Sequence, residues 1–589
     1  MTTKTRHAVF QPCALAVAVA LGCVAPVQAI TFNIGEVEGQ FDSALSVGAS
    51  WSVRGAEPAF VGTRNGGEAS SQTNDDGRLN FKKGETFSKI FKGIHDLELK
   101  YGDSGVFIRG KYWYDFETKD EQRLLYDIDD HNRKEAAQAS GAQILDAFVY
   151  HNYSIGSLPG SVRVGKQVVS WGESTFIQNS INSINPVDAA AFRRPGAEIK
   201  EGLIPVNMLY VAQSLTDSLS MEAFYQLEWD QTVIDNCGTF FSGGDTGADG
   251  CEDRLTVFGA DLPPGESANV FPGNTYVPRA GDRDARDSGQ FGVALRWFAE
   301  SLNDTEFGLY AMNYHSRTPN GSFTRTTTPS GLLIPGAPGA NYFLEYPEDI
   351  RLYGLSFQTN VGGTALSGEL SYRPNMPISI NSTDLTFAAL GVPTTPVFVS
   401  GHAQNVAGEE IQGYVRKHVT QAQISAVQFF DRVLGASRLT LVGEVGYNHV
   451  SGIDDDLGEL RFGRDPVYGI GDFAALGPLS CAALNSANPD ECNDDGFFTS
   501  NSWGYRLRAS ADYSNVFAGV NLTPSVAWSH DVDGYGPNFN EGSKAVSIGL
   551  NADYQNTYNA SLSYTDFFGG DYNTTTDRDF VALSFGVNF

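Results

Sequence analysis

Residues Asp579–Phe589 have the sequence DFVALSFGVNF and decide the fold. Apolar side chains occupy every second position, namely Val581, Leu583, Phe585, Val587 and Phe589. The positions between them are small or polar, so the stretch predicts a β-strand with different surroundings on its two sides. In a soluble sandwich the apolar side faces a core, whereas in a transmembrane barrel it faces lipid and the polar side faces the lumen. A terminal aromatic residue also resembles the signal that barrel-insertion machinery recognises.

The N-terminal segment, residues 1–29, has the features of a secretory signal peptide. Basic residues precede an apolar run, Cys13–Ala25, and Val27–Ala29 offers a small-residue cleavage site. A lipoprotein acylated at Cys23 and a transmembrane anchor are the alternatives, but the residue three before the cysteine is Ala and the apolar run is short. We therefore expect a secreted chain in which residues 30–589 form one barrel domain.

The composition favours β structure and excludes some partners. Aromatic residues make up 12% of the 589 residues, there are 64 glycines, and only 19% of residues are charged. No run of about eighteen apolar residues follows the signal, so no helical membrane span is expected. The formal charge of −29 argues against nucleic acid as a partner, because such binding depends on Lys and Arg.

Four cysteines follow the signal: Cys237, Cys251, Cys481 and Cys492. They allow three pairings, and the local pairs Cys237–Cys251 and Cys481–Cys492 are expected because each lies within one loop-like stretch. An oxidising destination permits these disulfides. A metal site is the alternative, but no CxxC motif or nearby His supports one, so we expect neither a metal nor a cofactor.

Alternation like that of the last strand recurs along the chain. It is found at 106–115, 219–229, 290–297, 366–373, 438–448, 503–513, 545–554 and 558–564. Aromatic residues at strand ends are typical of the two girdles of a membrane barrel, and here they are Trp229, Trp297, Tyr372, Tyr447, Tyr513, Tyr554, Tyr558 and Tyr564. Together these stretches favour the barrel over the sandwich.

Short and long connections alternate. The expected short turns are 102–105, 154–160, 299–303, 360–363, 432–437, 514–519 and 555–557. The expected long loops are 54–87, 117–140, 171–202, 230–285, 316–348, 375–417, 451–501, 531–543 and 567–578. This asymmetry is typical of outer-membrane barrels, with turns in the periplasm and loops outside the cell. Counting strands back from the C-terminus predicts an antiparallel barrel of about eighteen strands, with sixteen as the alternative.

The loop at 171–202 is unusually apolar for a solvated surface. Within it, Asn185-Pro186-Val187-Asp188 predicts a helix start with Asn185 as the cap, and Pro195-Gly196 predicts its end. We expect this loop to fold into the barrel and constrict it; the alternative is a loop packed over the mouth. The expected constriction residues are Trp171, Glu173, Asn182, Asn185, Asp188, Arg193 and Arg194.

Charged residues on the polar side of the predicted strands should face the lumen. They are Arg109, Lys111, Asp115, Glu222, Glu228, Arg296, Glu369, Arg373, Glu444, Arg506, Arg508 and Asp512. Because both signs occur, they either shape the field of an aqueous pore or pair across neighbouring strands and stiffen the wall. We expect most of them to pair.

Several motifs resemble the "domain of unknown function 1302" family of Gram-negative proteins. They are Gly39–Trp51, Leu79–Gly84, Val164–Asp188 with VSWGES, Pro195–Glu201, Glu222–Trp229, Tyr342–Tyr353, Ala527–Asn540 and Ser563–Asn573. The resemblance covers nearly the whole mature chain and implies an outer-membrane barrel without an assigned activity. Relatives often lie beside genes for inner-membrane exporters and a periplasmic lipoprotein-carrier-like protein, which implies traffic of hydrophobic molecules.

Nothing in the chain indicates an enzyme. Ser529-His530-Asp531 are adjacent in a predicted strand, so their side chains point to opposite faces and cannot form a triad. No GxSxG, HExxH or P-loop motif occurs. The acidic positions at 454–456, 494–495 and 571 match no EF-hand spacing, so we expect solvated loops there. The alternative is that their oxygen ligands bind Ca²⁺ or bridge divalent cations to lipopolysaccharide.

We therefore expect a transport channel in the outer membrane of a Gram-negative bacterium, one that handles hydrophobic compounds in concert with an inner-membrane exporter and a periplasmic carrier. The expected contacts are membrane lipid, lipopolysaccharide and the insertion machinery, which would recognise the strand ending in Phe589. The alternatives are a general diffusion porin, which needs an open and wet lumen, and a surface-binding or structural barrel that acts through its loops.

Overall fold

The computed structural model describes residues 30–123, 128–251, 254–259, 275–328, 338–453, 459–471 and 480–589. The expected signal peptide, residues 1–29, and the acidic run 454–456 lie outside these residues. Among the helices of the described residues, none is both long and apolar enough to cross a membrane.

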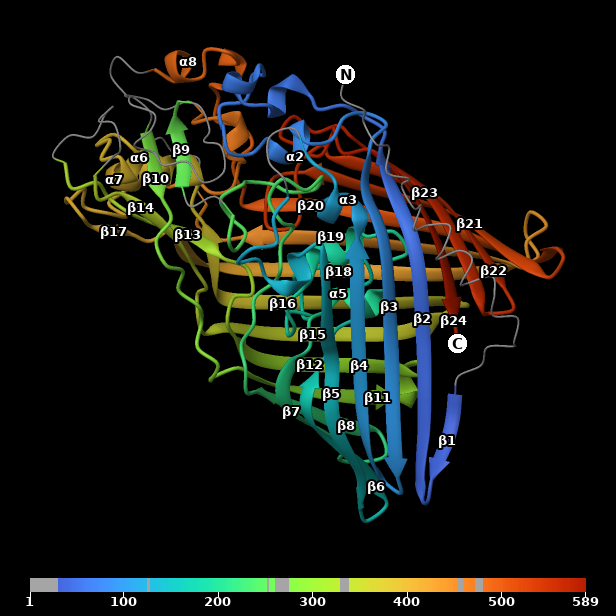
Figure 1. The fold of residues 1–589 in the computed structure, drawn as a ribbon. Helices are drawn as coiled ribbons and strands as arrows, with labels where there is room; N and C mark the ends of the chain where they lie inside the picture. The colour runs from blue at the N-terminus through green and yellow to red at the C-terminus, as the bar shows by residue number, and fades with distance from the viewer. Residues whose placement is uncertain are drawn as a thin grey trace, which may run out of the picture.

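A closed antiparallel sheet dominates the described chain (Figure 1). Its eighteen wall strands are β2 (Val37–Ser52), β3 (Thr86–Tyr101), β4 (Ser104–Asp115), β5 (Ser140–Ile155), β6 (Leu158–Gln167), β7 (Val206–Ser214), β8 (Leu219–Gln226), β11 (Phe291–Ala299), β12 (Thr305–Tyr314), β15 (Ile350–Val361), β16 (Thr364–Ser379), β18 (Tyr414–Asp431), β19 (Arg438–Val450), β20 (Asn501–Phe517), β21 (Val520–Asp533), β22 (Lys544–Tyr554), β23 (Tyr558–Phe568) and β24 (Phe580–Asn588). Each strand pairs with the next, and β24 pairs with β2 to close the ring. The predicted eighteen-strand barrel is confirmed.

The C-terminal strand closes the wall with the two faces that its sequence predicts. Phe585 lies on the outer face with 51% of its side chain exposed, whereas the neighbouring Ser584 is buried on the lumenal face. The backbone N–H of Phe589 donates to the carbonyl of Ser43 at 2.8 Å. A short strand, β1 (Ile30–Ile34), pairs with the same edge of β2 just beyond that point and continues the line of β24.

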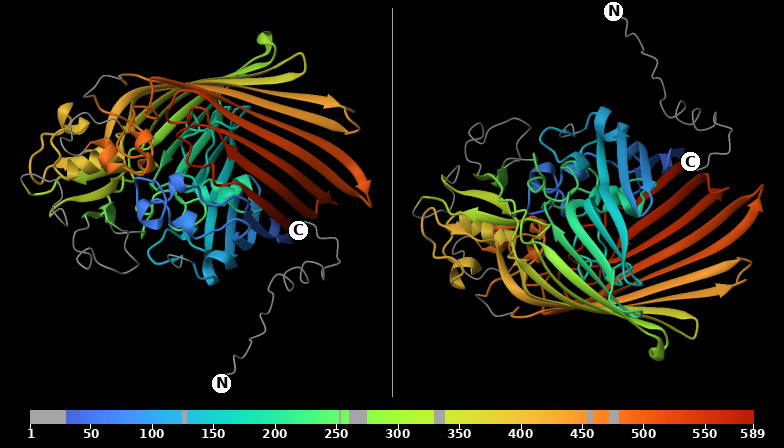
Figure 2. Two further views of the ribbon diagram at one scale, coloured as in Figure 1. Left: turned by 90° about the horizontal axis from the view of Figure 1, so that it is seen from above. Right: turned by 90° about the horizontal axis from the view of Figure 1, so that it is seen from below.

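Turns and loops gather at opposite ends of the barrel, as Figures 1 and 2 show. The predicted turns are present, together with one at 215–218 between β7 and β8 that the sequence pattern missed. We call the two ends of the molecule the turn end and the loop end. In an outer-membrane barrel they face the periplasm and the cell exterior, respectively.

The predicted aromatic girdle is correct for Trp297 and Tyr447, which are exposed on the outer face, but wrong for Trp229. Strand β8 ends at Gln226, so Trp229 lies beyond the wall in the folded loops. It is 9% exposed, packs on the ring of Tyr346 at 4.7 Å, and donates from Nε1 to a backbone carbonyl.

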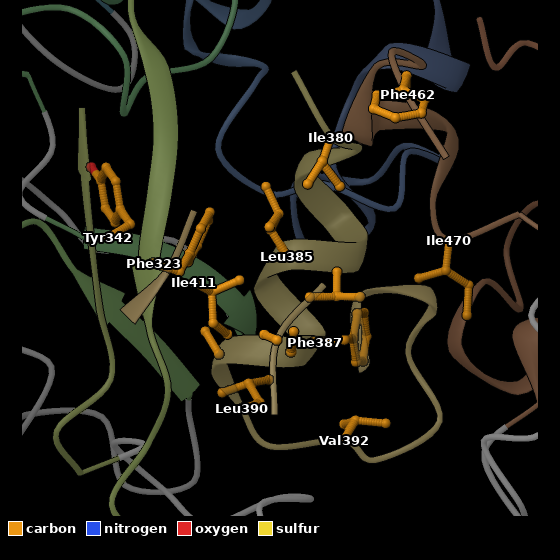
Figure 3. Packing of buried hydrophobic residues seen from close by; sticks show 14 of the residues in the cluster. Phe323, Tyr342, Ile380, Leu385, Phe387, Leu390, Val392, Ile411, Phe462 and Ile470 are labelled. Atoms are coloured by element: carbon orange, nitrogen blue, oxygen red, sulfur yellow. The ribbon is translucent and has the colours of Figure 1, made fainter. Parts of the chain in front are cut away.

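The long loops fold together at the loop end, and we call this part of the barrel the loop-end domain. Its elements are α2 (Asp76–Leu79), α3 (Phe116–Asp120), β9 (Arg254–Phe258), β10 (Thr275–Pro278), β13 (Asn320–Thr324), β14 (Asn341–Glu345), α6 (Ser382–Ala389), α7 (Pro396–Val399), β17 (Glu410–Ile411) and α8 (Cys481–Leu484). Figure 3 shows part of its apolar core, in which Leu385, Ile411 and Phe462 pack together. The disulfides Cys237–Cys251 and Cys481–Cys492 are both present.

We predict that Phe585→Arg destabilises the barrel in a bilayer, because a cationic side chain on the lipid face costs about 2–4 kcal/mol near the midplane. Asn559→Arg is the matched control, since Asn559 lies on the adjacent strand and lines a lumenal cavity. The folded fraction after reconstitution, measured as heat-modifiable mobility on gels, should fall for the first variant only. Equal losses would contradict the assignment of the two faces.

Candidate functional site

The connection between β6 and β7, residues 168–205, lies against the inner face of the wall, and we call it the lumenal segment. It carries two short helices, α4 (Ala189–Arg193) and α5 (Ile199–Gly202). Figure 1 shows α5 within the outline of the barrel. Six wall strands contribute side chains that bind the segment: β3, β4, β8, β16, β18 and β19. The contacts of the segment therefore reach nearly opposite sides of the ring.

Two buried carboxylates of the wall bind backbone amides in the first half of the segment. The Glu444 carboxylate accepts from the N–H groups of Thr175, Phe176 and Ile177 at 3.0, 2.6 and 2.7 Å. The Glu369 carboxylate accepts from the N–H groups of Glu173 and Ile181 at 2.6 and 3.3 Å. Hydrogen bonds to a charged group contribute about 1.5–3 kcal/mol each, so these carboxylates hold a coil that has no sheet of its own.

The carbonyl groups of the same coil are bound by neighbouring side chains. Arg373, which is 1% exposed, donates to the carbonyls of Asn179 and Ser180. Gln421 and Gln423 donate to the carbonyls of Gln178 and Ile177 at 2.8 and 3.3 Å. Buried donors and acceptors of the backbone are thereby paired, which a segment inside a barrel requires.

An apolar sector of the inner wall packs against the same half of the segment. Trp171, Ile181 and Ile184 are buried in one cluster with lumenal residues of β7, β8, β11, β12 and β15. The Trp171 Nε1 also donates to Glu222 at 2.7 Å. At Gly354 a Cβ would lie 2.8 Å from the Ile181 side chain, so only glycine allows this close approach.

Two lysines of the wall hold the second half. Lys111 pairs with Asp188 at 3.0 Å, and both side chains are buried. Lys92 pairs with Glu201 and also donates to the carbonyl of Gly196 at 2.7 Å. Breaking either pair would leave an uncompensated buried charge, which is strongly destabilising.

The predicted helix start is wrong by three residues. Helix α4 begins at Ala189, and its cap is Asp188, whose carboxylate accepts from the N–H of Ala191 at 3.0 Å. Asn185 cannot cap the helix because its side chain already bridges backbone groups of Gln167, Val169 and Ile204.

The other predicted constriction residues have diverse surroundings. Asn182 bonds to the Ser170 hydroxyl at an exposed position. Arg193 is exposed and pairs with Asp235. Arg194 donates to the carbonyl of Ala136 at 2.8 Å and stacks on Trp113.

The predicted lumenal charges fall into three groups. Arg109, Arg296 and Arg506 pair across neighbouring strands, with Asp96, Glu222 and Asp531 respectively. Lys111, Glu369, Arg373 and Glu444 bind the lumenal segment instead. Arg508 is exposed and makes no ion pair with the described residues, and Asp512 accepts from the Thr523 hydroxyl.

Two residues predicted to face the lumen have other places. Asp115 ends β4 and caps α3, accepting from the N–H groups of Glu117 and Thr118. Glu228 lies beyond β8 and accepts from Asn207.

Sequence reasoning missed several residues that bind the segment, including Lys92, Gln421, Gln423 and Arg317. Arg317 is buried and donates to the carbonyl of Ile184 at 3.1 Å. Lys92 stands among other charged residues of its stretch, including Lys89 and Asp96, so the sequence does not single it out, and uncharged Gln421 and Gln423 carry no signal either.

Two large cavities lie toward the turn end. One, of about 600 Å³, is bounded by the segment at Gly196–Lys200 and by β2, β3 and β22–β24. The other, of about 680 Å³, is lined by residues that include Asp103, Ser154 and Glu222. Polar and charged side chains predominate in both linings.

A closed wall, an outward apolar face and a segment inside the ring define a transmembrane β-barrel of the outer-membrane class. The chain belongs to the family described as "Protein of unknown function (DUF1302)", whose model matches residues 11–589.

Solved structures match most of the chain at low identity. OccAB1 of Acinetobacter baumannii is 11% identical with a TM-score of 0.38, covering 95% of this chain and 98% of that one. The outer membrane channel DcaP of the same species has 9% identity, a TM-score of 0.35 and coverages of 95% and 100%. OccD3 of Pseudomonas aeruginosa has 10% identity, a TM-score of 0.39 and coverages of 97% and 96%. No curated protein matches this chain.

We predict that Glu444→Ala loosens the first half of the lumenal segment, because three backbone amides lose their acceptor at once. The cost should be about 3 kcal/mol or more. Limited proteolysis should then cut within residues 173–183, which should resist cleavage in the wild type. Thr440→Ala on the same strand is the control; equal cleavage in both variants would contradict this role of Glu444.

A second prediction concerns pH. Burial, together with the nearby carboxylates of Glu306 and Glu369, raises the pKa of Glu173 from 4.5 to about 7, although Arg296 opposes the shift. The docked segment therefore favours the protonated form, and docking weakens as the pH rises from about 4.5 to 7. Proteolysis within residues 173–183 should be faster at pH 8 than at pH 5.5, relative to an unrelated substrate. Glu173→Gln should remove most of this difference, and an unchanged difference would refute the role of Glu173.

Proposed function

We propose that this protein is an outer-membrane channel whose lumen is closed, in this conformation, by the lumenal segment. One observation carries the proposal: the segment is hydrogen-bonded to β16, β18 and β19 on one side and to β3 and β4 on the other. An eighteen-strand ring is too wide for wall side chains alone to fill, so a segment that crosses it controls passage.

The cavities support hydrophilic solutes as the cargo. The lining of the cavity of about 600 Å³ includes Asp42, Lys92, Asp96 and Asp553 as well as several Ser and Asn residues. A general diffusion porin is the nearest alternative, and it requires that the segment leave an open path. The contacts of Glu369, Arg373 and Glu444 argue against such a path along the β16–β19 side.

Transport of hydrophobic compounds, with an inner-membrane exporter and a periplasmic carrier, is a narrower proposal. Its support is the family resemblance and the apolar sector of the inner wall, where Met208, Tyr310 and Leu352 lie. In this conformation Trp171, Ile181 and Ile184 occupy that sector. Hydrophobic cargo would therefore have to displace them.

The loop-end domain favours a further candidate, a binding role at the cell surface. An apolar core, which it shares with Ile378, Val419 and Val450 of the wall, and two disulfides make it more than a set of solvated connections. Retention of transport after alteration of exposed positions in this domain would separate a binding role from the channel role.

The fold is that of outer-membrane β-barrels. We therefore propose that the protein lies in the outer membrane of a Gram-negative bacterium, in contact with lipid and lipopolysaccharide. Recognition of the last strand by the insertion machinery is part of the same proposal. Exposed Phe585 and the alternation of β24 support it.

Single-channel conductance in planar bilayers tests the channel proposal. The wild type should show small, rare openings. Replacing Ser174–Arg194 by a short Gly-Ser linker should give steady currents about tenfold larger, since a wide barrel without its segment is an aqueous pore. Replacing Val406–Gly408 at the exposed tip of the loop-end domain is the control. If the wild type conducts freely and neither replacement changes the current, the segment does not close the lumen.

A further inference from the structure

The two halves of the lumenal segment differ in how firmly they are held. In the first half, Trp171, Ile181 and Ile184 are buried in the apolar sector. At least six backbone groups of residues 173–180 are bound by side chains of the wall. The turn Gly196–Ile199 is exposed, with Ile199 79% exposed. Displacing this turn would break far fewer contacts than displacing the first half.

The contacts of the turn are few and specific. Lys92 donates to the carbonyl of Gly196. Pro195 lies against β2 at Gly48, where a Cβ would approach the Pro195 Cβ to 2.6 Å. The neighbouring Gly196 faces Ser584 of β24. These contacts join the turn to the wall where β24, β2 and β3 lie side by side.

Cavities lie on both sides of this turn. Toward the turn end is the cavity of about 600 Å³, which we call the vestibule and which is lined in part by Gly196, Glu198 and Lys200. Toward the loop end a pocket of about 80 Å³ is lined by residues that include Arg194 and Ser88. Strand β3 passes both, since Ser88 lines the pocket and Lys92 lines the vestibule. The turn therefore separates two spaces that follow one another along the same part of the wall.

The vestibule carries an excess of negative charge. Its lining has four carboxylates, Asp42, Asp96, Glu198 and Asp553, and two ammonium groups. The ammonium groups are paired, Lys92 with Glu201 and Lys200 with Glu198, and Asp96 is paired with Arg109. Asp42 accepts from Gln40, and Asp553 from the N–H of Asn556, so neither is neutralised by a cation among the described residues. Carboxylates at a constricted aqueous mouth favour cations.

We propose that the turn Gly196–Ile199, with the flanking Pro195 and Lys200, is the movable gate of the channel and that the vestibule beneath it selects small hydrophilic cations. This inference rests on the proposed channel function. It restricts passage to one path, along β24, β2 and β3, and to one class of solute. The half of the segment at residues 171–184 stays fixed while the gate moves.

Cross-linking tests the gate. Gly48→Cys with Pro195→Cys should form a disulfide after a small displacement, since the Cβ atoms need a separation of about 3.8 Å. The oxidised protein should lose at least about nine-tenths of its open probability, a difference of 1.4 kcal/mol or more, and reductant should restore it. The single variants Gly48→Cys and Pro195→Cys, oxidised in the same way, are the controls and should show no change in open probability on oxidation. The wild type with and without reductant controls for the native disulfides.

Reversal potentials in a KCl gradient test the selectivity. Currents should reverse toward the potassium equilibrium potential, and Asp42→Asn with Asp553→Asn should shift the reversal toward zero. Asp304→Asn, on an exposed turn outside both cavities, is the control.

The outcomes distinguish the gate from the channel itself. If no form of the protein conducts, including the linker variant, the channel function fails. If the protein conducts but the Gly48–Pro195 cross-link has no effect, or currents reverse toward the chloride potential, the gate or its cation selectivity is refuted while the channel stands.

Discussion

The structure depends on the binding of backbone groups by buried side chains inside the barrel. A segment that enters a ring of this width leaves the sheet and loses the hydrogen bonds that strands provide. Glu369 and Glu444 replace those acceptors, and Arg373 replaces the donors. Each carboxylate binds more than one amide, so a few wall residues fix a coil of about ten residues. Without them, burial of Ile177 and Ile181 would leave unpaired backbone groups, at about 1–3 kcal/mol each.

Apolar packing and ion pairs add to these hydrogen bonds on different sides of the wall. Where β7–β15 pack against Trp171 and Ile181, most of the wall side chains are apolar, including Met208 and Leu352. Where β3 and β4 face it, Lys92 and Lys111 meet the carboxylates of Glu201 and Asp188. The segment is thus apolar toward one sector and ionic toward the other. This asymmetry leaves the larger open spaces at the turn end.

The sequence predicted the wall well because a barrel strand has two environments at a period of two residues. Val581–Val587 and Phe291–Trp297 show that pattern, and both lie where expected. The alternation is weaker where the lumenal face is itself apolar. Strand β3 carries the apolar Ile90 and Ile94 on its inner face, on either side of Lys92. Both isoleucines are buried inside the barrel, so the two faces of β3 differ little in polarity.

Contacts inside the lumen were the least predictable. Glu444 and Phe176 are 268 residues apart, and nothing local links them. Charges expected to pair across strands bind the segment instead, because an interior coil offers more acceptors and donors than a neighbouring strand does. Asn185 and Trp229 were assigned by local rules for caps and girdles, and tertiary contacts with Ile204 and Tyr346 decide their places.

Hydrogen exchange of the reconstituted protein is the most direct measurement of the central claim. The amides of Thr175, Phe176, Ile177 and Ile181 should exchange as slowly as strand amides, because each is bound to a buried carboxylate. The amide of Ala407, at an exposed loop tip, should exchange quickly. Rapid exchange of the four lumenal amides, at the rate of that loop tip, would contradict the account.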